Sequence, residues 1–157
     1  MRHVGVAAAL VLLSCAPESP CGPSSAVVER AIDGDTLELE GGQRVRMLLV
    51  DTPESTGGKT DCFGQNAAMF TAARVTGKRV QLAYDAAECR DRFNRLLAFV
   101  TVDGVELNRS LTEEGLACVL YIAPAGMARR DEFETYESQA KTSRVGMWGQ
   151  CATVTCE

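Results

Sequence analysis

The sequence of 157 residues lacks several features that would assign it to a common class of protein. It has one histidine, His3, and none of its cysteines is spaced as Cys-x-x-Cys, so little supports a zinc site. Lys and Arg number 16 against 21 Asp and Glu, and the net charge of −5 argues against a broad basic face that binds nucleic acid by charge alone. Internal repeats are absent, and a hydrophobic content of 46% excludes intrinsic disorder. The length fits one domain with a short appendage.

The only long apolar run, residues 4–13, follows a single positive charge at Arg2. It is too short to span a bilayer as a mature helix and is typical of a secretory signal. Residues 12–15, Leu-Leu-Ser-Cys, resemble a bacterial lipobox, which predicts a signal peptide over residues 1–14 and a lipid anchor on Cys15. An ordinary signal cut nearby would export the chain equally well. We therefore expect an exported protein, either a membrane-anchored lipoprotein of the envelope or a secreted or periplasmic one.

Composition divides the remainder of the chain into three parts. Residues 15–25, which include three prolines, are predicted to form a tether, followed by a domain over residues 26–150 and a tail over residues 151–157. An even number of cysteines in an exported chain is typical of disulfides, and the spacing alone leaves their pairing open. With Cys15 set aside, the cysteines are Cys21, Cys62, Cys89, Cys118, Cys151 and Cys156.

Hydrophobic periodicity predicts strands first and helices later. Alternation predicts strands over residues 26–32, 36–40, 43–50, 78–84, 96–102 and 117–122, with residues 47–50 buried on both faces. Helical spacing predicts helices over residues 64–76, 107–115 and 129–144. This order indicates an α+β fold, compatible with a small closed barrel that carries helices.

Charged residues gather in three segments at the ends of predicted strands: residues 33–36, 46–54 and 91–95. Any one of them alone is more simply a turn or a solvated pair of charges. Taken together they offer two kinds of chemistry. The acids are hard oxygen ligands that suit Ca²⁺ or Mg²⁺, and the arginines are planar forks that fit phosphate oxygens. Metal-assisted phosphodiester hydrolysis requires this combination.

These segments resemble those of the staphylococcal nuclease (thermonuclease) family over about residues 27–148. The resemblance is carried by Ile-Asp-Gly-Asp-Thr at 32–36, Arg-Met-Leu-Leu-Val-Asp-Thr-Pro-Glu at 46–54, Phe-Gly at 63–64, Asp-Arg-Phe-Asn-Arg-Leu-Leu-Ala-Phe at 91–99, and residues 108–119 and 146–148. It implies a five-stranded OB-fold barrel with three helices. The implied activity is Ca²⁺-dependent hydrolysis of DNA and RNA, preferably single-stranded or denatured, by a monomer. Water is the nucleophile, and the products carry a 3′-phosphate.

The resemblance also implies a role for particular residues. The ligands of one Ca²⁺ ion would be Asp35, Asp51 and Thr52, the last through its backbone carbonyl. The residues that act on the scissile phosphate would be Arg46 and Arg95, which bind it, and Glu54, which activates or positions the water. The residues that contact the nucleotide's terminal phosphate and its base or sugar would be Arg92 and Tyr121.

This chain departs from the family pattern at two kinds of position. Ala123 stands where a second tyrosine is expected, so less base stacking is available. The extra cysteines have no counterpart, and in the implied fold the loops of Cys62 and Cys89 flank the cleft. We therefore expect a Cys62–Cys89 disulfide and a Cys118–Cys151 disulfide, with Cys21 and Cys156 paired or free.

Two other functions compete with the nuclease. One is a catalytically silent OB-fold module that binds nucleic acid or protein, and the other is a structural lipoprotein with surface ion pairs. A silent copy is expected to lack at least one of Asp35, Arg46, Glu54 and Arg95, and all four are present. The nuclease is therefore favoured, while the sequence leaves open the preference for DNA or RNA and the biological role.

Overall fold

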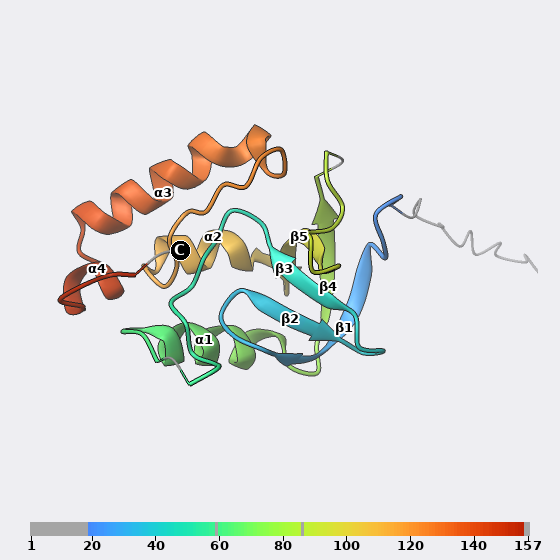
Figure 1. Cartoon of the computed structure of the whole chain (residues 1–157), viewed down its shortest axis with the longest axis horizontal. Coiled ribbons are helices and arrows are strands. Elements are labelled where there is room, and N and C mark those ends of the chain that lie inside the picture. Colours follow the sequence, from blue (N-terminus) through green and yellow to red (C-terminus); the bar gives the residue numbers. More distant parts are fainter. Residues whose placement is uncertain (1–18, 59, 86, 156–157) are drawn as a thin grey trace, which may run out of the picture.

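A computed structural model describes residues 19–58, 60–85 and 87–155 (Figure 1). The predicted signal peptide, Cys15 and Cys156 lie outside the described residues. The elements are β1 (Ser25–Ala31), β2 (Thr36–Leu39), β3 (Arg44–Met47), α1 (Gly64–Val75), β4 (Arg79–Tyr84), β5 (Leu96–Val102), β6 (Val105–Glu106), α2 (Leu107–Glu113), the 3₁₀ turn η1 (Met127–Arg129), α3 (Arg130–Thr142) and α4 (Met147–Gln150). Within these ranges no helix is both long enough and apolar enough to cross a membrane.

The strands form a closed five-stranded barrel, which confirms the expected α+β fold and the barrel that the resemblance implied. Their order is β3-β2-β1-β4-β5 with antiparallel neighbours, and a parallel pairing of β3 with β5 closes the sheet on itself. The two-residue β6 extends the sheet beyond β5. Side chains that alternate inward along the strands fill the barrel, including the fully buried Val28, Leu37, Val45, Val80 and Val100. This is the OB-fold architecture.

Helices cover two sides of the barrel. Helix α1 packs against β1, whereas α2 packs against β5 and carries α3 on its other side (Figure 1). The fully buried Phe133 of α3 contacts Phe99 of β5, with ring centroids 5.8 Å apart. These contacts leave one end of the barrel, where β2 begins and β3 ends, for the polar residues that follow.

The third predicted strand is shorter than expected, and its burial is as predicted. Residues 43–50 were expected as one strand, whereas β3 ends at Met47 and the chain then turns, with Leu49 at a φ of 62°. The apolar residues 48–50 remain buried. The strand ends early because the Arg46 guanidinium donates hydrogen bonds to the carbonyls of Met47 and Val50, so the backbone turns around this side chain.

The strand expected over residues 117–122 is wrong. This segment pairs with the site segment through an isolated bridge, in which Asp51 and Cys118 exchange backbone hydrogen bonds of 2.9 and 2.8 Å, and through a longer bond of 3.4 Å from the Leu120 N–H to the Leu49 carbonyl. The apolar residues there divide between the core, which holds the buried Ala117, and the cleft, which Leu120 and Ile122 line, while Val119 donates its N–H to Glu137 of α3. The predicted helices match α1, α2 and α3 to within a few residues, whereas β6 and α4 had not been predicted.

A buried asparagine joins α2 to the turn that follows β3. The Asn108 side chain is fully buried, accepts the N–H of Val100 at 2.8 Å and donates to the carbonyl of Leu48 at 2.9 Å. Both bonds satisfy backbone groups at points where the ladder between β3 and β5 ends. Asn108 therefore fixes the backbone just before Asp51.

The predicted disulfide pairing is wrong. The structure joins Cys21 to Cys89 and Cys62 to Cys151, with Cα–Cα distances of 4.9 and 6.0 Å, in place of Cys62–Cys89 and Cys118–Cys151. Cys118 is also disulfide-bonded. Strand order explains the first bridge: β1 runs antiparallel to β4, so the residues before β1 lie beside the residues after β4.

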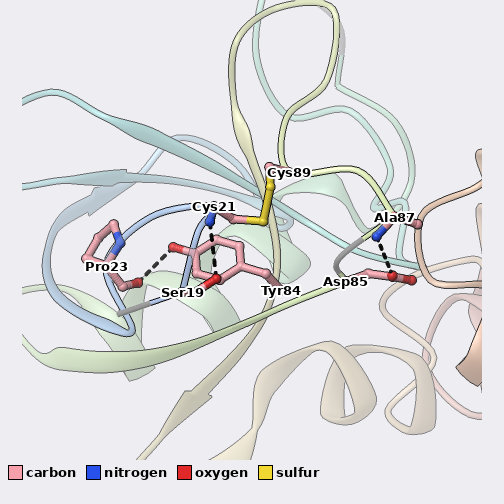
Figure 2. Close-up of a disulfide and its surroundings, with 7 residues drawn as sticks. All are labelled: Ser19, Cys21, Pro23, Tyr84, Asp85, Ala87 and Cys89. Atoms are coloured by element: carbon pink, nitrogen blue, oxygen red, sulfur yellow. Dashed lines mark hydrogen bonds between the residues drawn. A yellow bond between two sulfur atoms is a disulfide. The ribbon is translucent and has the colours of Figure 1, made fainter. Parts of the chain in front are cut away.

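The N-terminal segment is held at this bridge by polar contacts as well (Figure 2). The Tyr84 hydroxyl, at the end of β4, donates to the carbonyl of Pro23 at 2.8 Å, and the Cys21 N–H donates to the Ser19 side chain at 3.2 Å. The residues expected to form a tether are therefore partly ordered against the barrel from Ser19 onward.

Candidate functional site

The predicted site residues meet in a cleft of about 660 Å³ at one end of the barrel. Four segments line it: the turn before β2, the chain from β3 to Glu54, the turn before β5, and residues 120–125. The lining includes seven of the predicted residues: Asp35, Arg46, Asp51, Thr52, Glu54, Arg92 and Arg95. Parts of the chain that are distant in sequence are therefore brought together as the resemblance implied.

Tyr121 is the predicted site residue that does not line the cleft, although Leu120 and Ile122 on either side of it do. Its half-buried ring packs against the core, and the Arg130 guanidinium of α3 lies 5.1 Å from the ring centroid. Its hydroxyl oxygen is buried with no hydrogen-bond partner among the described residues. Ala123 lines the cleft and adds no aromatic surface, so the described cleft has Phe93 as its aromatic side chain.

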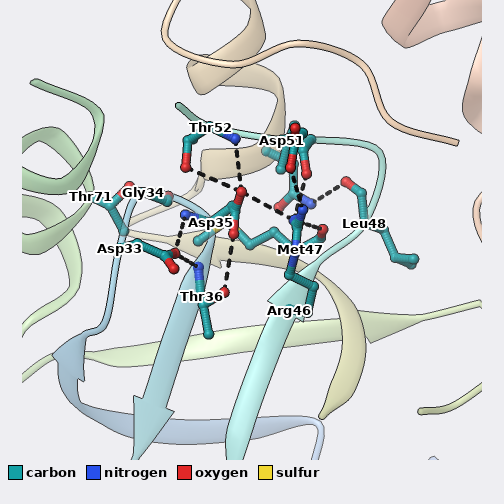
Figure 3. Close-up of polar contacts among 12 residues, drawn as sticks. Asp33, Gly34, Asp35, Thr36, Arg46, Met47, Leu48, Asp51, Thr52 and Thr71 are labelled. Atoms are coloured by element: carbon teal, nitrogen blue, oxygen red, sulfur yellow. Dashed lines mark hydrogen bonds and ion pairs between the residues drawn. The ribbon is translucent and has the colours of Figure 1, made fainter. Parts of the chain in front are cut away.

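Two buried carboxylates share one guanidinium at the centre of the cleft (Figure 3). Arg46 of β3 places Nη1 3.3 Å from an oxygen of Asp35 and Nη2 2.9 Å from an oxygen of Asp51. The Arg46 side chain is only 13% exposed. With its bonds to two carbonyls, this guanidinium is held on several sides, which fixes the two carboxylates relative to one another.

The turn before β2 aims Asp35 at the cleft. Asp33 accepts the N–H groups of Asp35 and Thr36 at 3.1 and 2.8 Å, which is the Asx-turn geometry expected of this sequence. Glycine is required between the acids, because a Cβ on Gly34 would lie 2.6 Å from the Thr52 side chain. Thr52 in turn donates its N–H and its hydroxyl to Asp35, at 2.8 and 3.1 Å.

Asp33 is a cleft residue that the sequence analysis treated only as part of a turn. It lines the cleft, and burial, reinforced by the negative charge of Asp35, raises its pKa to about 6. The signal that could have identified it is the presence of two acids on either side of one glycine in Asp-Gly-Asp, because a simple turn needs only one of them.

The donor set fits a hard divalent cation. Asp35 and Asp51 present oxygens on the same guanidinium, so a cation bound there would be held by two carboxylates that are already ordered. Within the described ranges no group of three or more His, Cys, Asp or Glu side chains forms a closed metal cage. The remaining ligands would have to be neutral oxygens such as a backbone carbonyl, water and substrate phosphate, which Ca²⁺ accepts in its flexible shell of about 6–8 oxygens.

Glu54 differs from the two aspartates because its carboxylate is not engaged. The residue lines the cleft and is half-buried, and its carboxylate forms no hydrogen bond or ion pair with any described residue. Its backbone is fixed, since its carbonyl accepts the Asp61 N–H at 2.9 Å and a Cβ on Gly64 would lie 2.2 Å from that oxygen. The result is a held carboxylate with its oxygens available to a water molecule.

Arg95 is presented by a tight turn that Asp91 organises. The Asp91 carboxylate accepts the N–H groups of Phe93 and Arg95 at 2.9 and 3.0 Å, and the Nε of Arg95 at 2.6 Å. Asn94 adopts the left-handed conformation that the turn requires, with a φ of 63°. The two Nη groups of Arg95 form no hydrogen bond with described residues, so a complete two-point face remains for an anion.

An exposed phenylalanine lies between the two arginines of this turn. The Phe93 ring is 64% exposed, with the guanidinium carbons of Arg92 and Arg95 at 4.7 and 5.3 Å from its centroid. Base stacking on an aromatic ring is worth about 1–3 kcal/mol, and the neighbouring guanidiniums add positive charge. The turn therefore combines an aromatic face with phosphate-binding groups.

Comparisons with known proteins agree with this geometry. A family described as staphylococcal nuclease homologue matches residues 44–150. Endonuclease YncB and the SPbeta prophage-derived endonuclease YokF, both of Bacillus subtilis (strain 168), are 37% and 35% identical over 134 residues, in each case 82% of this chain. These alignments cover only 63% and 45% of the two relatives, so the chain spans less than two thirds of either protein's length.

A shorter relative is matched along nearly its whole length. The thermonuclease of Staphylococcus hyicus is 31% identical over 159 aligned positions, which cover 91% of this chain and 93% of that protein. The family match begins at Arg44 and ends at Gln150, and so spans the chain from β3 to α4. This chain belongs to the staphylococcal nuclease homologue family.

Proposed function

We propose that this protein is a calcium-dependent nuclease that hydrolyses phosphodiester bonds of DNA and RNA with water as the nucleophile. The observation that carries the proposal is that the charged groups of one cleft differ in how far the protein itself binds them. Arg46 is fixed by two carboxylates, whereas Arg95 has free Nη groups and Glu54 has a free carboxylate among the described residues. Family membership and the printed names of the relatives support the same activity.

The residues of the chain have distinct tasks in this proposal. Arg95 binds the scissile phosphate in two-point contact, while Arg46 offsets charge that develops on the phosphoryl oxygens. Glu54 positions a water molecule and accepts its proton as the water oxygen bonds to phosphorus. The bond from phosphorus to the 5′ oxygen breaks, that oxygen takes a proton from solvent water and leaves as a 5′-hydroxyl, and the other product keeps a 3′-phosphate. Asp35, Asp51 and the Thr52 carbonyl would hold Ca²⁺. That ion would supply Lewis-acid stabilisation of the phosphoryl oxygens.

The proposal also includes export. The predicted signal peptide and the lipid anchor on Cys15 lie outside the described residues, so the support comes from elsewhere in the chain. Two disulfides close loops of 68 and 89 residues, and such bridges persist mainly in oxidising compartments. Mass spectrometry of the protein from a membrane fraction tests the anchor: a diacylated N-terminal Cys15 supports it, and an unmodified N-terminus contradicts it.

The test of activity uses purified protein with denatured DNA and with RNA, in Ca²⁺ or in a chelator. We expect cleavage only with Ca²⁺, products that end in a 3′-phosphate, and a loss of about a hundredfold or more in kcat for Glu54→Gln. Glu29→Gln is the matched control, since Glu29 is an exposed acid of β1 outside the cleft. Cleavage that survives both the chelator and Glu54→Gln would contradict the proposal, and binding without cleavage would favour the silent module.

A further inference from the structure

A second groove, of about 780 Å³, shares part of its wall with the cleft. Residues 41–44, at the hairpin between β2 and β3, form one side, and residues 90 and 93–95 form the other. Phe93 and Arg95 line both the groove and the cleft. A chain that leaves the cleft past Phe93 would therefore enter this groove, which none of the site residues predicted from the sequence, apart from Arg95, helps to form.

The groove is positively charged, in a protein whose net charge is −5. Its wall carries three arginines, Arg44, Arg90 and Arg95, and none of its described lining residues is acidic. Arg44 is 55% exposed, and its nearest carboxylate, Glu38 at 3.7 Å, is held more closely by another arginine. Arg90 donates to the carbonyl of Asn94 at 2.9 Å and forms no ion pair within the described part of the chain.

The shape of the groove suits an extended strand. The hairpin tip is Gly41–Gly42, where an added Cβ would find no atom within 4 Å, so this rim is bare backbone open to solvent. Both glycines have positive φ angles of 90° and 82°, which a larger residue would adopt only with strain. The sequence therefore keeps side chains away from the rim and leaves the guanidiniums reachable.

We propose that this arginine groove binds the backbone phosphates of nucleotides that flank the cleaved bond in a single-stranded polynucleotide. The inference rests on the proposed function and adds a substrate class to it, since strands that reach the groove are bound more tightly than dinucleotides. Guanidinium forks match phosphate oxygens, and the aromatic ring at the junction accepts any base. A flexible single strand can pass from the cleft into this groove, in keeping with the unpaired DNA or RNA already expected as substrate.

The experiment compares a dinucleotide with an oligothymidylate of about 12 nucleotides, within the range of about 4–16 that one OB fold covers. In Arg44→Gln/Arg90→Gln we expect the ratio of kcat/KM for the long substrate over the short one to fall about tenfold. Fluorescence anisotropy in EDTA measures binding of the oligonucleotide alone. There the slope of log affinity against log salt should fall by about 1.4, or about 0.7 for each lost phosphate contact.

Arg74→Gln/Arg79→Gln is the matched control, because both arginines are exposed and line neither the cleft nor the groove. It removes the same charge and should keep the wild-type ratio and salt slope. The single substitution Arg44→Glu leaves the Arg90–Asn94 hydrogen bond in place, and Arg44 forms no hydrogen bond or ion pair with that turn among the described residues. It should lower the ratio further than Arg44→Gln.

The outcomes separate the two proposals. Wild-type cleavage of both substrates with an unchanged ratio and salt slope in the variants would overturn the groove and leave the nuclease intact. Absence of cleavage, together with oligonucleotide binding that depends on Arg44, would overturn the nuclease and support the groove. A third outcome is that the wild-type protein binds vesicles of phosphatidylserine and phosphatidylcholine, and that Arg44→Gln/Arg90→Gln loses this binding but still binds the oligonucleotide. This outcome would assign the groove to anionic lipid and overturn the inference.

Discussion

The two arginines of the cleft are the same residue type in different structural situations. Arg46 is 13% exposed and bound to two carboxylates and two carbonyls, whereas the Arg95 side chain is 25% exposed and its guanidinium hydrogen-bonds, among the described residues, only through Nε, to Asp91. A guanidinium whose donors are bound by the protein mainly fixes the surrounding backbone and places its positive charge at one point. One with free donors can bind a ligand in two-point contact.

Lysine substitutions should therefore separate stability from catalysis. Arg46→Lys cannot bridge both buried aspartates, so we expect the free energy of unfolding to fall by about 3–5 kcal/mol along with activity. Arg95→Lys should leave the free energy of unfolding within about 1 kcal/mol, because the lost pair is partly exposed, while kcat/KM falls about a hundredfold. Urea denaturation in EDTA and steady-state kinetics measure both quantities. Equal destabilisation by the two variants would contradict this assignment.

At the scale of secondary-structure elements, α3 is attached to the barrel through Arg129. The guanidinium binds both oxygens of Glu132 at 2.8 and 3.0 Å and an oxygen of Glu106 at 2.8 Å, and it lies over the Phe99 ring at 4.5 Å. The hydrogen bonds from Arg129, and then the one from the Tyr136 hydroxyl, lower the pKa of Glu132 to about 2. One polar cluster thus joins the start of α3 to β5 and β6.

This cluster predicts an acid dependence of stability. The pKa of Glu132 is about 4.5 unfolded and about 2 folded, so its contribution is complete above pH 4.5 and is lost as the pH falls through 2. Its side chain is 39% exposed, and solvent screening reduces the expected effect to about 1 kcal/mol. Glu132→Gln should lose that free energy of unfolding at pH 6 and match wild type near pH 2. The control is Glu134→Gln, which removes an exposed ion pair with Arg130 on the same helix. If both variants differ from wild type in the free energy of unfolding with the same pH dependence, the prediction is refuted.

Hydrophobic periodicity predicted most of the helices and strands, because in most of them the apolar residues lie on the face that is buried. The alternation over residues 78–84 corresponds to buried and exposed side chains that alternate along β4, and the helical spacing of α1 and α3 corresponds to faces that pack inward, whereas β5 is buried almost throughout. The pattern failed where a distant group decides the backbone. Residues 48–50 turn because they surround the Arg46 guanidinium, and residues 117–122 divide between the core and the cleft, where Leu120 and Ile122 face, instead of joining the sheet.

The candidate site followed from the sequence as far as spaced motifs describe it. Acids and arginines at strand ends were expected to converge, and seven of those residues line the cleft. Tyr121 does not, because its neighbours face the cleft while its ring packs under Arg130. Disulfide pairing depends on strand order, which no local pattern contains, and it was wrong for that reason.

At the scale of the whole molecule, the Cys21–Cys89 and Cys62–Cys151 disulfides each lie close in sequence to a segment that lines the cleft. Cys89 lies two residues before Asp91, and its carbonyl accepts the Leu97 N–H at 2.9 Å, so the Cys21–Cys89 bridge anchors the base of the Arg95 turn. The Cys62–Cys151 bridge follows Asp61 directly in sequence, and the Asp61 N–H donates to the carbonyl of the cleft residue Glu54. Each bridge thus joins a terminal segment to one loop of the cleft.

Removing the first bridge should weaken substrate binding more than it slows the chemical step. For Cys21→Ala/Cys89→Ala we expect a loss of about 2–4 kcal/mol in the free energy of unfolding, because a long loop is released in the unfolded chain. The turn that presents Arg95 then loses its anchor, so KM should rise severalfold while kcat changes little at a temperature well below the melting point. Cys62→Ala/Cys151→Ala is the matched control, with a similar loss of stability and no comparable rise in KM. If the two variants raise KM equally at equal stability, the bridge acts on the fold as a whole and not on the Arg95 turn.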